Sequence, residues 1–189
     1  MAVRVAVLDD YQGVARELAA WDRLPDGSGL TIFTDHVDDA EELVRRLAPF
    51  DIIVAMRERT AFPRTLLERL PDLRLLVTTG MGNAAIDLAA ARERGITVSG
   101  TGGLPAPPAE LTWGLILSLA RHIPEEDRSV RDGGWQRTIG VELAGRTLGV
   151  IGLGNLGKRV AAVGLAFGME VIAWSQNLSA RDAAAVGVQ

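Results

Sequence analysis

The 189-residue sequence lacks cysteine and has only two histidines. The lack of cysteine excludes disulfides, thiolate metal sites and a cysteine nucleophile. Charge of one sign is not in excess, because 20 Lys and Arg residues stand against 24 Asp and Glu residues. This balance favours binding neither to nucleic acid nor to anionic lipid. No apolar run approaches the roughly 20 residues that span a bilayer, and we expect a cytoplasmic globular protein without a bound metal.

Apolar periodicity alternates between short strand-like runs and helical spacing along the first hundred residues. Regular alternation with nearly continuous apolar strands predicts an α/β fold with a parallel sheet covered on both faces. The expected strands are 3–8, 30–33, 52–55, 73–77 and 96–98, and the expected helices are 14–21, 40–47, 65–70 and 86–94.

A stretch rich in glycine and proline follows at residues 100–108. We expect this stretch to continue neither a helix nor a sheet ladder. It places a domain boundary that divides the chain into residues 1–100 and 101–189. The pattern beyond it predicts helices at 110–122 and from about 124, a break at 133–135, strands at 147–151 and 170–174, and helices at 155–167 and 182–186.

The most informative motif is Gly152-Leu153-Gly154-Asn155-Leu156-Gly157, between an apolar strand and a helix. Gly152 permits a tight turn, Gly154 lets the main chain approach a pyrophosphate, and Gly157 lets the helix pack on the strand. The helix start offers the amides of Asn155 and Leu156 and the positive end of its dipole to phosphates. The strand–loop–helix–strand context predicts a dinucleotide site rather than a glycine-rich turn that only packs.

The next strand end lacks the acidic residue that usually holds the adenosine ribose of NAD. It reads Ser175-Gln176-Asn177, whose neutral side chains neither select ribose hydroxyls strongly nor repel a 2′-phosphate. Arg181 is either a partner for that phosphate or a solvated charge at a helix start. The choice between NAD and NADP therefore stays open.

Read together, these features resemble the D-isomer-specific 2-hydroxyacid dehydrogenases. The resemblance is carried by four stretches, residues 76–87, 94–98 with the linker, 108–112, and 143–151 running into the glycine motif. It implies a flavodoxin-like parallel-sheet substrate domain at 1–100 and an incomplete Rossmann-type NAD(P)-binding domain at 101–189. It also implies a homodimer that transfers hydride between nicotinamide and C2 of a 2-hydroxy or 2-oxo acid.

The resemblance also assigns roles to individual residues. The main-chain amides of Met81 and Gly82 match a cradle for the substrate carboxylate, although the glycines here also suit a plain tight turn. Arg57, after the third strand, is either a cation in the substrate cleft or a solvated charge. Thr112 matches a position near the nicotinamide, or its hydroxyl is bonded to its own helix backbone.

The family's catalytic His, Arg and Glu follow the second strand of the nucleotide domain, beyond the stretches matched here. We expect both His36 and His122 to be structural or solvent-facing, so this chain contains no catalytic residue and has no turnover alone. The chain is then a fragment of a longer enzyme, an unusual self-associating form or a decayed copy. Two alternative functions are a cofactor-sensing protein that resembles the related corepressors and a non-functional remnant.

Overall fold

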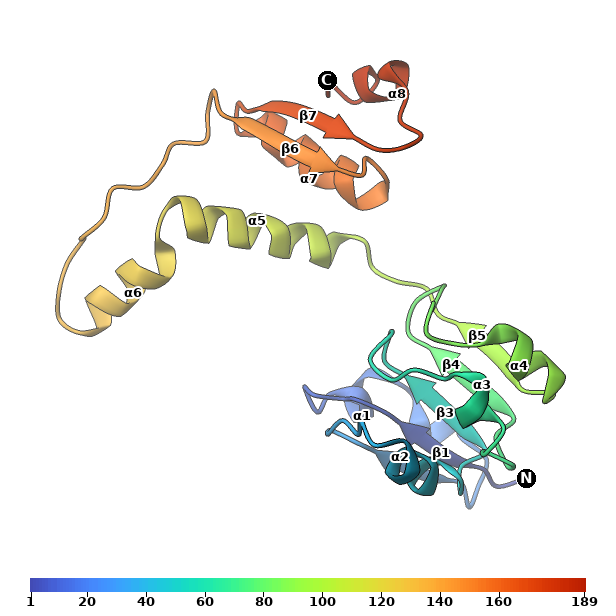
Figure 1. Cartoon of the computed structure of the whole chain (residues 1–189). Helices are drawn as coiled ribbons and strands as arrows, with labels where there is room; N and C mark the ends of the chain where they lie inside the picture. Colours follow the sequence, from blue (N-terminus) through green and yellow to red (C-terminus); the bar gives the residue numbers. More distant parts are fainter. The chain divides into compact units, whose positions relative to one another are not determined.

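The computed structural model describes residues 1–189, which form two compact units, Met1–Gly103 (unit 1) and Leu104–Gln189 (unit 2). Unit 1 contains a five-stranded parallel sheet and unit 2 a two-stranded one (Figure 1). The α/β fold class is therefore confirmed. None of the helices combines the length and the apolar character that crossing a bilayer requires. The domain roles expected for residues 1–100 and 101–189 stay predictions.

The sheet of unit 1 has the strand order β2-β1-β3-β4-β5, and all its neighbouring strands are parallel. Its strands are β1 (Arg4–Val7), β2 (Gly29–Ile32), β3 (Ile52–Ala55), β4 (Leu75–Thr78) and β5 (Thr97–Gly100). Every predicted strand is present, with small shifts at the ends. Because the strands are parallel, their carboxyl ends lie at one edge of the sheet, where ligands of such folds bind.

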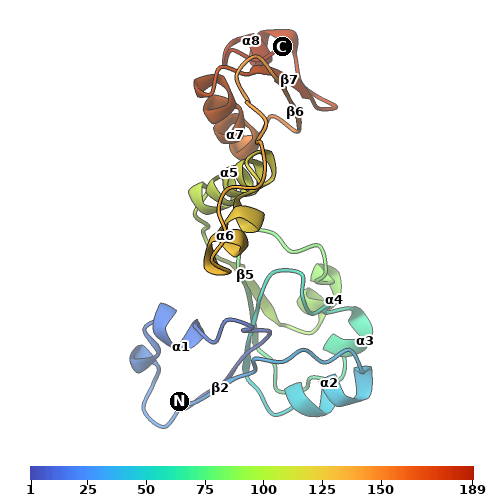
Figure 2. The ribbon, with the colours of Figure 1, turned by 90° about the vertical axis from the view of Figure 1, so that its left-hand side faces the viewer.

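The helices of unit 1 lie unequally on the two faces of its sheet. They are α1 (Ala15–Leu18), α2 (Ala40–Leu47), α3 (Arg64–Leu67) and α4 (Leu88–Glu93), with a 3₁₀ turn η1 (Trp21–Arg23). Figure 2 shows α2, α3 and α4 on one side of the sheet and α1 on the other. The α2 helix begins after Asp39, whose carboxylate accepts the Glu42 N–H at 2.8 Å. An N-cap side chain commonly gives a partner in this way to an amide that has none within the helix.

The core of unit 1 lies between the sheet and α2, α3 and α4. Phe62, Leu67 and Leu76 are fully buried there. In β3 and β4, residues that face these helices are buried, and the intervening ones are only half-buried. The predicted cover on both faces holds for β1, where Val5, Ala6 and Val7 are all buried. On β3 and β4 the second face is only half-buried, because α1 is a single turn.

Unit 2 contains one βαβ step and two helices that precede it. Its elements are α5 (Ala106–Ala120), α6 (Ile123–Arg131), β6 (Thr147–Ile151), α7 (Asn155–Ala166), β7 (Glu170–Trp174) and α8 (Ala180–Ala184). Strands β6 and β7 are parallel, and Gly168 ends α7 with a φ of 72°. The outer edge of β7 is paired with Gln189, whose N–H donates to the Val171 carbonyl at 2.9 Å.

The stretch at 100–108 differs from its prediction at both ends. Gly100 belongs to β5, and α5 begins at Ala106, so Pro107 and Pro108 lie in the first helical turn. Proline is tolerated there because the first helical amides have no partner within the helix. The prediction that this stretch continues neither a strand nor a helix was wrong at these positions.

The core of unit 2 is small and centres on α5 and α7. The Trp113 indole N–H donates to the Val160 carbonyl at 3.1 Å, and its ring centroid lies 5.0 Å from that of Phe167. Gly164 of α7 faces both Trp113 and β6, because a Cβ there would meet the Leu148 side chain at 2.7 Å. The close packing of α5 and α7 therefore holds β6, the strand that leads into the glycine motif.

Candidate functional site

The first candidate site lies at the carboxyl edge of the unit 1 sheet, around Arg57. This residue follows β3 in a left-handed conformation, with a φ of 56°. Its N–H donates to the Thr79 hydroxyl at 3.0 Å, and its Nη1 donates to the Thr79 carbonyl at 3.2 Å. Non-glycine residues avoid this backbone region unless their surroundings impose it, and such residues cluster at functional sites. The turn after β4 thus fixes the Arg57 guanidinium.

Gly80 is the residue that allows this approach. Its φ is 110°, and a Cβ at this position would lie 1.9 Å from Arg57 Nη1. Gly80 also joins the loop after β4 to the end of β5, because its N–H donates to the Thr101 hydroxyl at 2.9 Å. No residue with a side chain could keep the Arg57 guanidinium in its place.

The amides of Met81 and Gly82 follow directly and point to no acceptor. Neither N–H donates a hydrogen bond within the protein. The Met81 side chain is 81% exposed, and a Cβ on Gly82 would meet nothing within 4 Å. Free amides beside a guanidinium provide the donors that a carboxylate accepts. The loop after β4 can therefore be both a tight turn and a site that binds an anion.

A second arginine, Arg59, reaches the same edge and was missed in the sequence. Its Nη1 donates to the Asp9 carbonyl at 2.5 Å, and its guanidinium lies 4.5 Å from the centroid of the Tyr11 ring. No carboxylate forms an ion pair with it. The signal was available, because Arg57-Glu58-Arg59 repeats a basic residue at alternate positions directly after a buried strand.

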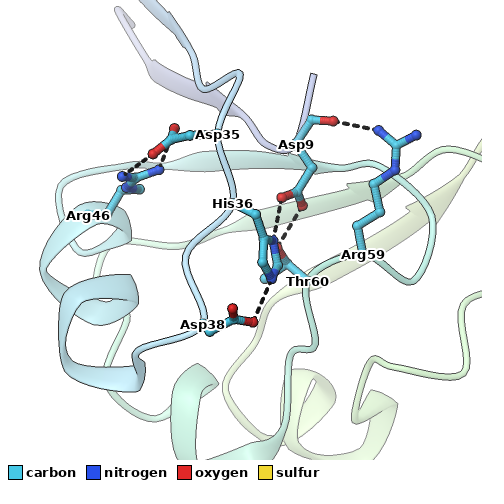
Figure 3. A network of polar contacts seen from close by, with 7 residues as sticks. All are labelled: Asp9, Asp35, His36, Asp38, Arg46, Arg59 and Thr60. Atoms are coloured by element: carbon cyan, nitrogen blue, oxygen red, sulfur yellow. Dashed lines mark hydrogen bonds and ion pairs between the residues drawn. The ribbon is translucent and has the colours of Figure 1, made fainter. Parts of the chain in front are cut away.

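Asp9 itself is a buried residue just after β1, and Figure 3 shows its polar contacts. It accepts hydrogen bonds from His36 Nδ1 at 2.7 Å and from the Thr60 hydroxyl at 2.7 Å. His36 Nε2 in turn contacts Asp38 Oδ1 at 3.1 Å. The hydrogen bond to Asp9 is the main reason why the pKa of His36 is raised. Both imidazole nitrogens are engaged, so His36 is not a free general base.

The other histidine, His122, lies between α5 and α6 in a left-handed conformation, with a φ of 53°. It lines a pocket of unit 2 together with Leu115, Leu119 and Arg128. None of the residues of the glycine motif lines that pocket. His122 is thus separate from the candidate sites of its own unit.

The second candidate site is the glycine motif of unit 2. Gly152 has a φ of 92° and donates its N–H to the Trp174 carbonyl at 2.7 Å. A Cβ on Gly157 would lie 2.0 Å from the Gly152 carbonyl oxygen, whereas one on Gly154 would meet nothing within 4 Å. Gly157 is therefore required for packing of α7 on the loop, and Gly154 leaves open space above it.

The first turn of α7 presents unpaired donors at this open space. No side chain caps the helix at Gly154, and neither the Asn155 nor the Leu156 N–H donates within the protein. The helix is 12 residues long, so its amino end carries a positive dipole charge. Such a turn suits a phosphate group.

Thr112 of α5 lies beside this loop. It lines a pocket of about 340 Å³ together with residues of β6 and with Gly152, Leu156 and Gly157. Its hydroxyl donates to the Pro108 carbonyl at 2.8 Å, which is the backbone bond that the sequence left as an alternative. The hydroxyl is thus satisfied within its own helix, and the side chain borders the loop, while a place near the nicotinamide stays a prediction.

Ser175 and Gln176 follow β7, next to the carbonyl of Trp174 that accepts the Gly152 N–H. Ser175 is half-buried and Gln176 is exposed. Arg181 lies in the first turn of the short helix α8 with an exposed side chain, and no ion pair holds it. This strand end therefore offers neutral hydrogen-bonding groups and one unpaired cation to a ribose or a phosphate.

Comparison with known proteins gives consistent matches. Residues 113–189 match the family model of the D-isomer specific 2-hydroxyacid dehydrogenase NAD binding domain. A hydroxypyruvate reductase of Thermotoga maritima is 38% identical over 148 residues, which cover 77% of this chain and 48% of the relative. Human D-3-phosphoglycerate dehydrogenase is 36% identical over 189 residues, which cover 98% of this chain and 34% of the relative.

A solved structure agrees with these matches over almost the whole chain. The crystal structure of a phosphoglycerate oxidoreductase from Vibrio cholerae has a TM-score of 0.90 and 41% identity. The match covers 99% of this chain and 60% of that protein. The chain thus spans between about a third and about three-fifths of the length of these three relatives.

Proposed function

This chain belongs to the D-isomer specific 2-hydroxyacid dehydrogenase family, and on that premise we propose that it contributes to an NAD(P)-dependent oxidoreductase acting on a 2-hydroxy or 2-oxo acid. Residues 1–100 form the substrate domain. Residues 101–189 form part of the NAD(P)-binding domain. The related hydroxypyruvate reductase and phosphoglycerate dehydrogenases support this substrate class.

Fold details support the two domain roles. The order β2-β1-β3-β4-β5 in unit 1 is the flavodoxin-like order, in which ligands bind outside the carboxyl ends of the strands. In unit 2, the glycine motif joins β6 to α7, and β7 returns parallel to β6. This step is the first half of a Rossmann-type nucleotide-binding unit.

The free amides of Met81 and Gly82 beside the Arg57 guanidinium are the observation that carries the substrate assignment. They hold the carboxylate of the acid by hydrogen bonds from the backbone, and Arg57 supplies the counter-charge. Gly80 keeps the guanidinium in place, because a side chain there would occupy its position. Binding the carboxylate fixes the position of C2, the neighbouring carbon of the acid.

The glycine motif of unit 2 holds the pyrophosphate of the dinucleotide. The unpaired amides of Asn155 and Leu156 donate to it, and the open space above Gly154 admits it. Thr112 borders the same loop, and Ser175 and Gln176 bind the adenosine ribose. When bound, the nicotinamide accepts or supplies the hydride. The neutral strand end leaves NAD and NADP as equal candidates.

We propose that this 189-residue chain has no turnover alone. Its two histidines do not supply a free base, because both nitrogens of His36 contact carboxylates and His122 lies away from the glycine motif. Oxidation of a 2-hydroxy acid needs a base for the hydroxyl proton. Substrate and cofactor binding are therefore the activities to measure.

A homodimer fits the surface of unit 2. Large apolar side chains recur on α5 at intervals of four residues and remain exposed, namely Leu111, Leu115 and Leu119. Exposed apolar stripes of this kind are typical of interaction surfaces. We propose that a second copy of the chain covers them.

The cofactor assignment is tested by Gly154→Ala. The free protein has room for this methyl group, because nothing lies within 4 Å and the φ is −80°. The methyl group stands where the pyrophosphate must approach, so we expect at least about tenfold weaker NADH or NADPH binding by calorimetry. Gly114→Ala, in α5 with equally free space, is the matched control and retains wild-type affinity. Equal affinity of the Gly154→Ala and wild-type chains, or a wild type that binds neither cofactor, contradicts the assignment.

A further inference from the structure

Asp9 combines burial with an unfavourable backbone. The residue is 2% exposed and has a φ of 56°, although it carries a side chain and a charge. Left-handed backbone at a non-glycine residue and a buried carboxylate both cost free energy, so the surroundings must hold Asp9 in place. Its neighbour Asp10 has an evident structural role, because its carboxylate accepts the Ala15 N–H at the start of α1. Asp9 serves no helix in this way.

Three loops meet at the Asp9 side chain, as Figure 3 shows. Asp9 follows β1, His36 follows β2, and Thr60 follows β3. His36 Nδ1 and the Thr60 hydroxyl each donate to a different carboxylate oxygen, both at 2.7 Å. The main-chain carbonyl of the same residue accepts from Arg59 Nη1 at 2.5 Å. The carboxylate of Asp9 is thus fixed by His36 and Thr60, and its main-chain carbonyl accepts from Arg59.

We propose that His36 is a positioning residue for the carboxyl edge of the unit 1 sheet. Together with Thr60, His36 holds the Asp9 carboxylate. The Asp9 main-chain carbonyl is thereby held as well, and it positions the Arg59 guanidinium. This inference rests on the proposed function, because it takes the carboxyl edge of the unit 1 sheet as the place where the acid binds. The Tyr11 ring supports the same guanidinium from its face at 4.5 Å. Arg59 then adds an unpaired positive charge to the edge that contains Arg57.

Protonation of His36 matters for this role because only the imidazolium donates from both nitrogens. Asp9 is buried, whereas the Asp38 side chain is 97% exposed. A pocket of about 330 Å³ gives solvent access to the imidazole. When His36 loses its proton, one of its two contacts is lost, and the buried Asp9 loses the positive charge that offsets its own.

The charged groups around the imidazole come from five segments of unit 1. Asp9 raises the pKa of His36 most strongly, and Asp38 adds to the effect. The remaining groups lie in the loop before α2, on α2, after β3 and in the turn after α3: Asp35, Glu41, Arg46, Arg59 and Arg69. Asp35 and Arg46 pair with each other at 2.8 Å, as do Glu41 and Arg69 at 2.6 Å, so Asp9 remains the main partner of His36.

The test uses the full 189-residue chain and nitrogen-15 NMR of the His36 ring and the Arg59 side chain as a function of pH. We expect the Arg59 Nε–Hε resonance to shift with the same midpoint as the His36 ring. Asp9→Asn should lower the pKa of His36 toward its ordinary value. In His36→Gln the pH-dependent shift of Arg59 should disappear, whereas His122→Gln should preserve it.

A second arm measures binding of hydroxypyruvate, a 2-oxo acid, below and above the His36 midpoint. We expect affinity to fall about three- to tenfold as His36 loses its proton, and this loss to be absent in His36→Gln. Thr60→Ser should retain the Arg59 shift, and Thr60→Val should diminish it. If the Arg59 resonance of the wild type does not shift as His36 titrates, the inference is overturned. This measurement needs no variant. Failure of hydroxypyruvate to bind at any pH contradicts the proposed function instead, while the Arg59 resonance still decides on the inference.

Discussion

Unit 1 and unit 2 are built by the same alternation of strand and helix, yet they differ in how far they bury their sheets. In unit 1, three helices cover one face of five strands around one continuous core. In unit 2, two small clusters support two strands. Ile151 of β6 is 87% exposed and Trp174 of β7 is 68% exposed.

A local motif can therefore form its geometry in a unit that has only a small core. The glycine motif has its tight turn and its close helix packing although the sheet beside it has two strands. The Arg57 edge of unit 1 instead depends on contacts among loops that are distant in sequence, such as Arg57 with Thr79. Substitutions in the two units should therefore have different consequences.

Phe62→Ala should have the largest effect on stability. The Phe62 side chain is fully buried in the core of unit 1, and removing such a ring typically costs about 3–5 kcal/mol. Trp174→Ala in unit 2 should change the free energy of unfolding by less than about 0.5 kcal/mol. Urea unfolding followed by circular dichroism measures both. Similar losses from the two substitutions would contradict the contrast between the units.

Gly157→Ala should rank second and act on unit 2 alone. The added Cβ would lie 2.0 Å from the Gly152 carbonyl oxygen, so α7 must move away from the loop at a cost of about 1–3 kcal/mol. Fluorescence of Trp113, which packs on α7, should report an earlier transition of this unit. Gly154→Ala provides the comparison, because its Cβ has free space. A stable Gly157→Ala chain with normal packing would show that the close approach is not required.

His36→Gln should remove a pH-dependent part of the stability of unit 1. The pKa of His36 is raised in the folded state, so this stabilisation is fully present below the ordinary histidine pKa of about 6.5. It disappears as the pH rises through the raised folded-state value. We expect His36→Gln to lower the free energy of unfolding by about 1–2 kcal/mol at pH 5.5. Well above the raised pKa of His36, the variant and the wild type should differ little. Unfolding curves at several pH values test this, and a loss that is the same at every pH would contradict it.

Leu115→Gln should have the smallest effect on folding and a clear effect on association. Leu115 is exposed on α5, so its replacement should change stability by less than about 0.5 kcal/mol. Sedimentation should show weaker self-association, because the substitution interrupts the apolar stripe. Leu18→Gln, an exposed leucine of unit 1, is the control. Unchanged association of Leu115→Gln would place the contact between copies elsewhere.

Local signals were sufficient for most elements and for the glycine motif. Strands β3, β6 and β7 and helix α2 have the predicted bounds, because their apolar patterns and helix ends are defined by nearby residues. The network of Asp9, His36 and Thr60 could not be predicted in this way. Its members are separated by 27 and 51 positions in the sequence and meet only because β1 lies between β2 and β3.

The local sequence pattern also could not predict which faces of the unit 1 sheet are covered by helices. The apolar runs of the strands predicted burial on both sides. This holds for β1, but alternate residues of β3 and β4 are only half-buried, and α1 ends after one turn at Leu18. Burial depends on which element packs against a face, and that is a property of the whole fold. Roles such as those of Met81 and Thr112 follow from the family resemblance and stay predictions.

The central claim is that unit 2 binds a dinucleotide through its glycine motif while the Arg57 edge of unit 1 binds the carboxylate of a 2-oxo acid. Amide-resolved NMR titration of the 189-residue chain tests both parts together. NADH or NADPH should shift the amides of Gly154, Asn155 and Leu156, and hydroxypyruvate should shift those of Met81 and Gly82. Shifts spread over other surfaces, or none in these two loops at saturating ligand, would contradict the account.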